Sequence, residues 1–195
     1  MIEDFLLNTG RVYIYGEIEA SLRTIQELTY LGDCGYTLIH IYVDSVGGDP
    51  DRACAIIDKI CELKEMGVIV NLVVQGVAYS CAADIVVFGS EALGYPSCKL
   101  MLHPAKFQLE YEEINKHAQS IVFEGKMQEV MLQKIAKTCG YRGKSVKVFA
   151  EKIKNDLWVD LKEAIKLGLL DRVYTKEDEL KLIEHNKELS IKYNS

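Results

Sequence analysis

Two kinds of hydrophobic pattern alternate along the first half of the chain. Short apolar, β-branched runs such as TLIHIYVD at 37–44 are typical of strands buried on both faces of a sheet. Longer segments between them carry apolar residues at helical spacing and end at a glycine, which is typical of amphipathic helices. The pattern predicts strands over 11–18, 37–44 and 68–74, helices over 21–32 and 51–67, and a further helix that starts at Ser80.

The second half continues in the same manner but contains one much longer helical pattern. It predicts a turn with Gly94 and Pro96, a short strand ending at His103, a long helix over 109–140, and two short helices with a last strand up to residue 175. Strands that alternate with helices predict an α/β fold with a largely parallel sheet. We expect a single domain over 1–175, followed by a charged tail, 176–195, that is either a surface helix or partly disordered.

Composition and charge narrow the function classes. The net charge of −6 over 195 residues gives no support to a nucleic acid partner. No apolar run is long enough for a membrane span, and the first residues lack the features of a secretory signal. The cysteines have no zinc-like spacing, so we expect reduced thiols in a cytoplasmic protein with no metal and no cofactor. They are Cys34, Cys54, Cys61, Cys81, Cys98 and Cys139.

Ser80 and His103 are the residues whose positions suggest catalysis. Ser80 stands where a buried strand gives way to a helix, so its hydroxyl can be a helix cap or a nucleophile. A serine nucleophile needs a base within hydrogen-bond reach. His103 ends a strand just before a proline and is the best candidate, because His40 lies in a buried strand pattern while His117 and His185 lie among polar residues.

The sequence gives a less specific signal for the orienting carboxylate and for the glycine turn. Asp84 follows Ser80 by one helical turn and can be only a surface charge, and Asp156 can be only the N-terminal cap of the helix after it. The Gly47–Gly48 turn can bind phosphate, supply a backbone N–H to an oxyanion, or be a tight turn and nothing more. No glycine-rich nucleotide motif and no G-x-S-x-G motif is present.

Four segments taken together resemble the proteolytic subunit of the Clp protease. They are IHIYVDSVGGDPDRACAIIDKI, VVQGVAYSCAADIVVFGSE, KLMLHPAK and NDLWVDLKEAIKLGLLDRV, and they occur in the family's order over about residues 11–175. The family shows N-S-P-G-G, then G-x-A-A-S-M, then an M-I-H-Q-P-like run, then an R-D-x-F/W segment. The 109–140 helix stands in the place of the family's handle helix.

The resemblance implies the ClpP/crotonase fold of repeated β-β-α units and a serine endopeptidase. It assigns Ser80 as nucleophile, His103 as general base and acid, and Asp156 as the orienting carboxylate. It also assigns the backbone N–H groups of Gly48 and Cys81 to the oxyanion hole. Only Ser80 and His103 are indicated independently by the residues themselves.

The resemblance also implies partners: an unfolded polypeptide substrate and further copies of the chain, in a heptameric ring or a double ring that encloses the active sites. The sequence departs from the family at DSVGG, at Tyr79 beside the nucleophile, and at Pro104 directly after His103. Only ten residues precede Arg11, so we expect the axial-loop segment to be absent, which argues against docking to a Clp-type AAA+ unfoldase.

Several alternatives remain open on the sequence. One is a phage-type head-maturation protease of the same fold, and another is a catalytically silent ring subunit. A third is a crotonase-type acyl-CoA enzyme, whose glycine-turn N–H groups hold a thioester enolate without any triad. The last alternative is a catalytic Ser–Lys pair in which Lys106 takes the place of the histidine.

Overall fold

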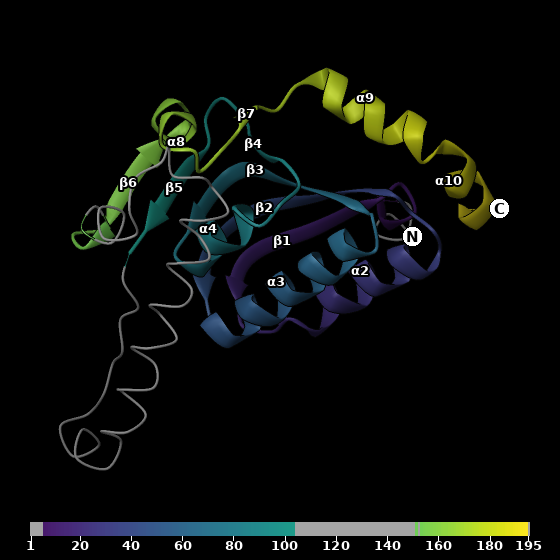
Figure 1. Ribbon diagram of the computed structural model, residues 1–195, viewed down its shortest axis with the longest axis horizontal. Coiled ribbons are helices and arrows are strands. Elements are labelled where there is room, and N and C mark those ends of the chain that lie inside the picture. Colours follow the sequence, from purple (N-terminus) through teal and green to yellow (C-terminus); the bar gives the residue numbers. More distant parts are fainter. Residues whose placement is uncertain (1–5, 104–150, 152, 195) are drawn as a thin grey trace, which may run out of the picture.

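The centre of the protein is a largely parallel sheet, seen edge-on in Figure 1. The computed structural model describes residues 6–103, 151 and 153–194. The strands are β1 (Arg11–Ile18), β2 (Leu38–Gly48), β3 (Ile69–Tyr79), β4 (Ala92–Gly94), β5 (Lys99–Leu102), β6 (Leu157–Asp160) and β7 (Arg172–Val173). The predicted α/β fold with a mostly parallel sheet is therefore confirmed.

The sheet branches at β3. Its main path runs β1-β2-β3-β4-β7, and every pair along that path is parallel. The first half of β3, Leu72–Val74, pairs with β4, whereas Val77–Tyr79 pairs with β5. Strand β6 then joins β5 in the one antiparallel pairing among the described strands. This branch carries the candidate catalytic residues.

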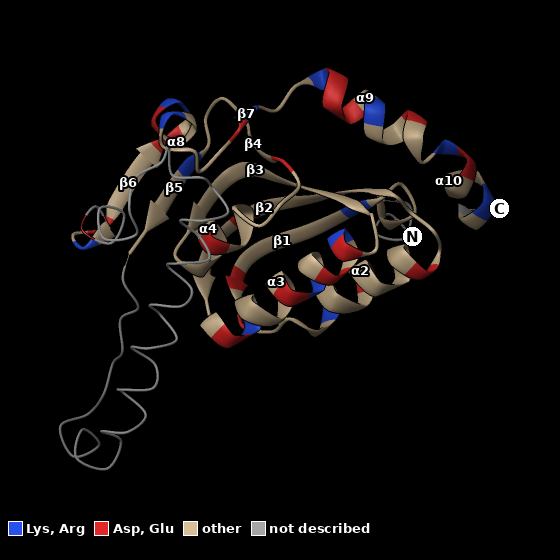
Figure 2. Ribbon diagram, viewed as in Figure 1, with Lys and Arg blue, Asp and Glu red and all other residues tan. Residues whose placement is uncertain are grey.

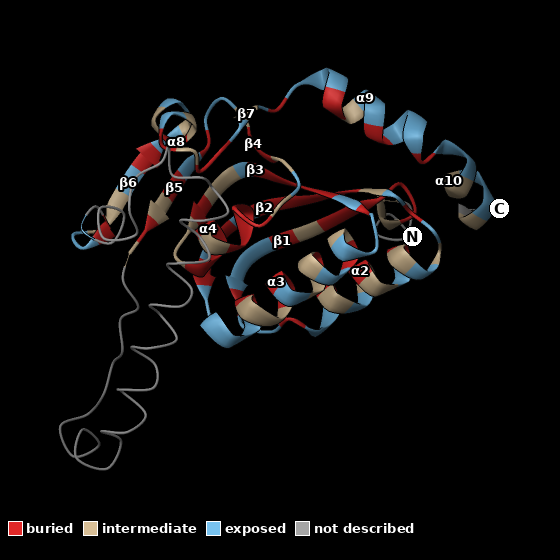
Figure 3. Cartoon of the chain, in the orientation of Figure 1, coloured by how far each residue is buried: buried red, intermediate tan, exposed pale blue. Residues whose placement is uncertain are grey.

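Helices cover one face of the sheet and build the core with it. Helices α2 (Leu22–Asp33) and α3 (Pro50–Glu65) lie side by side below the sheet, and α4 (Cys81–Val86) lies beside them (Figure 1). Because side chains alternate along a strand, Ile39, Ile41 and Val43 of β2 point into this core. Figure 3 shows the buried residues concentrated in the strands and on the inner sides of these helices.

The sequence pattern places most of these elements well but misses two strands. Strands β2 and β3 each continue past their predicted ends at residues 44 and 74, so the Gly47–Gly48 turn forms the last part of β2. The predicted turn at Gly94 is strand β4, and β6 lies where only helices were expected. Helix α8 (Leu161–Leu167) is present, while the predicted helix over 109–140 lies outside the described residues.

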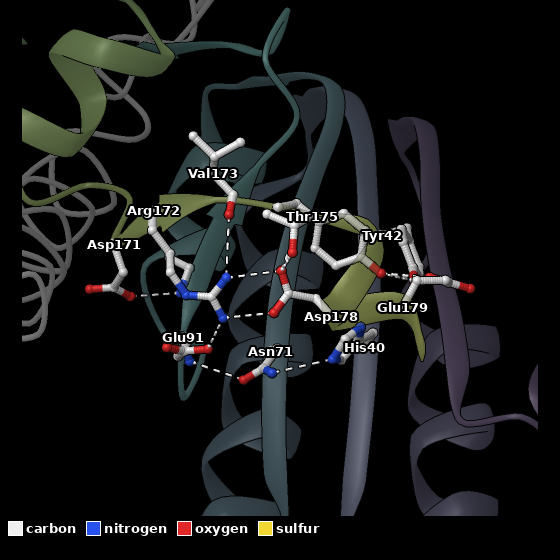
Figure 4. Close-up of polar contacts among 12 residues, drawn as sticks. His40, Tyr42, Asn71, Glu91, Asp171, Arg172, Val173, Thr175, Asp178 and Glu179 are labelled. Carbon is white, nitrogen blue, oxygen red and sulfur yellow. Dashed lines mark hydrogen bonds and ion pairs between the residues drawn. The ribbon is translucent and has the colours of Figure 1, made fainter. Parts of the chain in front are cut away.

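The C-terminal residues form two helices that return to the sheet. Helix α9 (Lys176–His185) contacts β2 on the face opposite to α3, and α10 (Lys187–Asn194) follows it (Figure 1). Glu179 of α9 accepts hydrogen bonds from Tyr42 at 2.6 Å and from Tyr174 at 2.5 Å, and pairs with Arg11. Arg172 binds Asp178 through two nitrogens at 2.9 Å, as Figure 4 shows.

Charged residues lie mainly on the helices, whereas the strands carry few of them (Figure 2). Within the described part of the chain, no helix combines the length and apolar character that a membrane span requires. Cys34, Cys61, Cys81 and Cys98 are free thiols there.

Candidate active site

Ser80 has an unusual backbone at the end of β3. Its φ is 56° and its ψ is −133°, a conformation that non-glycine residues rarely adopt. The hydroxyl makes no cap hydrogen bond to α4. Instead, Ser80 Oγ lies 2.8 Å from Nε2 of His103. The helix-cap interpretation of Ser80 is therefore wrong, and its hydroxyl is paired with the histidine that the sequence indicated.

Strand pairing brings Asp156 to the same place. Leu102 at the end of β5 lies opposite Leu157 at the start of β6, so His103 and Asp156 are the next residues at the same edge. Ser80 and Asp156 are also the two non-glycine residues with positive φ in the described chain, both at 56°. Such backbone strain is concentrated at functional sites.

Asp156 does not cap a helix. Helix α8 begins at Leu161, and its cap is Asp160, whose side chain accepts the N–H of Glu163 at 2.9 Å. Asp156 instead precedes β6, whose short antiparallel pairing the sequence pattern did not predict. The cap interpretation of Asp156 is therefore wrong as well.

The Gly47–Gly48 turn packs directly against the serine. A Cβ at Gly47 would lie 2.7 Å from Cβ of Ser80 and 2.6 Å from the carbonyl oxygen of Tyr79. A Cβ at Gly48 would lie 2.6 Å from the carbonyl oxygen of Ile18. Both residues also have positive φ, so only glycine fits this close approach.

The two backbone N–H groups expected to form the oxyanion hole both lie close to the side chain of Cys81, the residue after Ser80. Burial raises the pKa of the Cys81 thiol to about 11, whereas the N–H groups of Gly48 and Cys81 both favour the thiolate. Backbone N–H groups next to a serine hydroxyl suit the binding of a developing oxyanion.

The remaining sequence candidates lie apart from this site or outside the description. Burial lowers the pKa of His40 to about 4, and this histidine lies between β2 and α9, with Asn71 3.3 Å from its Nε2 (Figure 4). His185 is exposed and contacts Thr37 at 2.8 Å. His117, Pro104, Lys106 and Cys139 lie outside the described residues.

An aromatic pair borders the site and was not expected from the sequence. Tyr79, directly before the serine, meets Trp158 of β6 edge to face, with ring centroids 5.0 Å apart. Trp158 is 59% exposed. Tyr79 of β3 and Trp158 of β6 therefore form an aromatic contact across β5, in which the tryptophan is open to solvent. No group of metal-binding side chains occurs within the residues that the structure describes.

Comparison with known proteins agrees with this architecture. The sequence pattern of the Clp protease family matches residues 1–177. The proteolytic subunit 2 of the ATP-dependent Clp protease of Treponema denticola is 29% identical over 174 residues, which cover 86% of this chain and 82% of that protein. A mutant ClpP1 of Listeria monocytogenes superimposes with a TM-score of 0.77 at 25% identity, covering 93% of this chain and all of the other.

The matched range includes the candidate nucleophile, base, carboxylate and glycine turn. It favours a peptidase over the acyl-CoA enzyme considered from the sequence. The chain belongs to the Clp protease family and is a serine-type peptidase.

Proposed function

We propose that the protein is an endopeptidase in which Ser80, His103 and Asp156 act as a catalytic triad. The observation that carries the proposal is the 2.8 Å contact between Ser80 Oγ and His103 Nε2, made by a serine in a strained conformation. A serine hydroxyl is a weak nucleophile at neutral pH, and an adjacent imidazole activates it. The strain holds Oγ at the histidine rather than at a helix N–H.

Acylation begins when Ser80 Oγ attacks the carbonyl carbon of the scissile peptide and its proton passes to Nε2 of His103. The carbonyl oxygen becomes an oxyanion, which the N–H groups of Gly48 and Cys81 bind. The carbon–nitrogen bond then breaks, and the leaving amine takes the proton from Nε2. The product is an acyl-enzyme ester on Ser80.

Deacylation repeats these steps with water. His103 accepts a proton from the water as its oxygen attacks the ester carbon, and the proton then returns to Ser80 Oγ as the ester bond breaks. Asp156 orients the imidazole through its other nitrogen and stabilises the positive charge that forms on it. The register of Leu102 and Leu157 supports this role, because it sets Asp156 beside His103.

The family suggests the setting in which this chemistry takes place. We propose that copies of the chain assemble into a ring, or a stacked double ring, that encloses the active sites. Access to the enclosed space would then select unfolded polypeptides and peptides over folded proteins. The resemblance of the whole chain to Clp protease subunits supports this assembly.

Replacement of the nucleophile tests the proposal. Ser80→Ala removes Oγ, so hydrolysis of a fluorogenic peptide should fall at least about 10³-fold while the assembly is retained. Ser97→Ala is the matched control, because Ser97 is exposed in the turn before β5. Hydrolysis by Ser80→Ala at the rate of the control would overturn the nucleophile assignment.

A further inference from the structure

A carboxylate that the proposed triad does not use lies one helical turn beyond the nucleophile. The backbone N–H of Asp84 donates to the carbonyl oxygen of Ser80 at 3.3 Å. Residues four apart on a helix lie on the same face, with Cβ atoms about 5–6 Å apart. Asp84 therefore stands on the same side of α4 as the serine.

Burial along the helix shows which side remains open. From Ser80 to Phe88, every residue is buried except Ser80 and Asp84, which are half-buried. The buried residues pack against α3 and the strands. The accessible side of α4 thus carries the candidate nucleophile and a single carboxylate.

Among the residues that the structure describes, this carboxylate has no charge partner. Within the described residues, the Asp84 side chain has no hydrogen bond and no ion pair. Partial burial raises the pKa of Asp84 to about 7. Removing a carboxylate from water without giving it a partner is costly, and such groups are normally paired.

The charge of Asp84 also reaches the position of the expected oxyanion. Asp84 acts electrostatically on the thiol of Cys81, the residue after the candidate nucleophile, and raises its pKa, whereas the backbone N–H groups of Gly48 and Cys81 lower the pKa of the same thiol. An ionised carboxylate near a developing oxyanion opposes the formation of the transition state. A cation beside Asp84 would remove this penalty.

We infer that Asp84 is a specificity-determining residue, which makes the enzyme prefer substrates with a lysine or arginine side chain at the residue that supplies the scissile carbonyl. The inference rests on the proposed function. The substrate residue bound to Ser80 is the one whose side chain can reach a carboxylate one helical turn away. Its ammonium or guanidinium group pairs with Asp84 and cancels the charge that opposes the oxyanion.

The experiment compares three fluorogenic peptides that differ only at this residue, which is arginine, lysine or leucine. The wild-type chain should cleave the basic peptides at least about tenfold faster than the leucine peptide, measured as kcat/KM. Asp84→Asn should lower cleavage of the basic peptides at least about tenfold and raise cleavage of the leucine peptide. Asp84→Glu should keep the preference for basic residues.

Asp51→Asn is the matched control, because it makes the same chemical change at an exposed aspartate in the first turn of α3. This control variant should prefer the basic peptides over the leucine peptide as strongly as the wild type does. The inference is wrong if Asp84→Asn changes kcat/KM by the same factor for all three peptides. It is also wrong if the wild-type chain prefers the leucine peptide.

Labelling of Ser80 by a fluorophosphonate, measured in parallel, separates the two proposals. Labelling with no basic preference rejects only the role of Asp84. The absence of both labelling and cleavage in the folded wild-type chain rejects the proposed function and the inference with it.

Discussion

At the scale of single residues, the site depends on two strained positions. A positive φ costs a non-glycine residue about 1–3 kcal/mol, and the surrounding structure must compensate for it. Ser80 and Asp156 both have φ of 56°, and both flank the pairing of β5 with its neighbours. The backbone N–H of Ser80 donates to the carbonyl oxygen of Met101 at 2.7 Å, which ties the serine to β5.

The role of Asp156 can be tested by a change that keeps its shape. Asp156→Asn should lower kcat by about 10²–10⁴-fold, because the amide no longer stabilises the imidazolium or its tautomer. Steady-state peptide hydrolysis measures this. Asp160→Asn makes the same change at the cap of α8, where asparagine caps equally well, so its activity should stay at the wild-type level. Similar rates for the two variants would remove Asp156 from the triad.

Asp84 should also affect stability in a pH-dependent manner. Its pKa is raised to about 7 in the folded chain, so ionisation of Asp84 destabilises the fold as the pH rises from about 4 through 7. Asp84→Asn should therefore increase the free energy of unfolding by roughly 1–4 kcal/mol at about pH 8.5. Near pH 4 the increase should largely vanish.

Urea denaturation of the wild type, Asp84→Asn and Asp51→Asn at both pH values measures this effect. If Asp84→Asn increases the free energy of unfolding by the same amount at both pH values, the charge of Asp84 does not destabilise the fold.

Part of this site could be predicted from the sequence alone. Ser80 stood out because it lies between a predicted strand and a predicted helix, and His103 because it ends a predicted strand just before a proline. Asp156 could not be chosen among many aspartates, since only the antiparallel register of Leu102 with Leu157 sets it beside His103. The position of Asp84 was visible one turn from Ser80, but its burial depends on packing of α4 against α3 and the sheet.

At the scale of elements, α9 docks on part of the second face of the sheet, over β2. Glu179 accepts hydrogen bonds from Tyr42 and Tyr174 and pairs with Arg11. Burial opposes its charge, but these contacts hold the pKa of Glu179 below its usual value. Asp178 behaves in the same way: burial opposes its charge, while Arg172 and Thr175 lower its pKa to about 2.

Removal of the central carboxylate should release this contact. Glu179→Ala removes the carboxylate that pairs with the buried Arg11 guanidinium and accepts from two tyrosine hydroxyls, so the free energy of unfolding should fall by about 2–4 kcal/mol. Glu177→Ala removes an exposed carboxylate from the same helix and should cost under about 0.5 kcal/mol. Chemical denaturation at neutral pH measures both.

The sign of the pH effect follows from the lowered pKa values. Stability from Asp178 and Glu179 is present above their unfolded pKa values and is lost as the pH falls from about 4 toward 2. The difference between Glu179→Ala and the wild type should therefore shrink in acid. An equal cost for Glu177→Ala and Glu179→Ala would contradict this account of how α9 docks.

Long periodic elements were predictable, and short paired ones were not. The apolar runs of β1, β2 and β3 and the stripes of α2 and α3 have clear periods. Strands β4 and β6 span only three and four residues and exist because a neighbouring strand pairs with them. The glycines in β2 and β3 suggested turns, but in the fold they allow close packing within continuous strands.

At the scale of the whole molecule, the site lies where parallel strands end. The Gly47–Gly48 turn lies at the end of β2, Ser80 follows β3, and His103 follows β5. These strand ends meet at one edge of the sheet, as is usual for sites of α/β proteins. Asp156 joins them from the start of β6, because β6 runs antiparallel to β5. The branch at β3 thus gathers four distant segments of the chain.

The measurement that tests the central claim most directly is labelling of the full chain with a fluorophosphonate, followed by mass spectrometric mapping of the modified residue. The account predicts modification at Ser80, lost in His103→Ala, because the hydroxyl is reactive only beside its histidine. Modification at another residue, or equal labelling of Ser80 in His103→Ala, would contradict it.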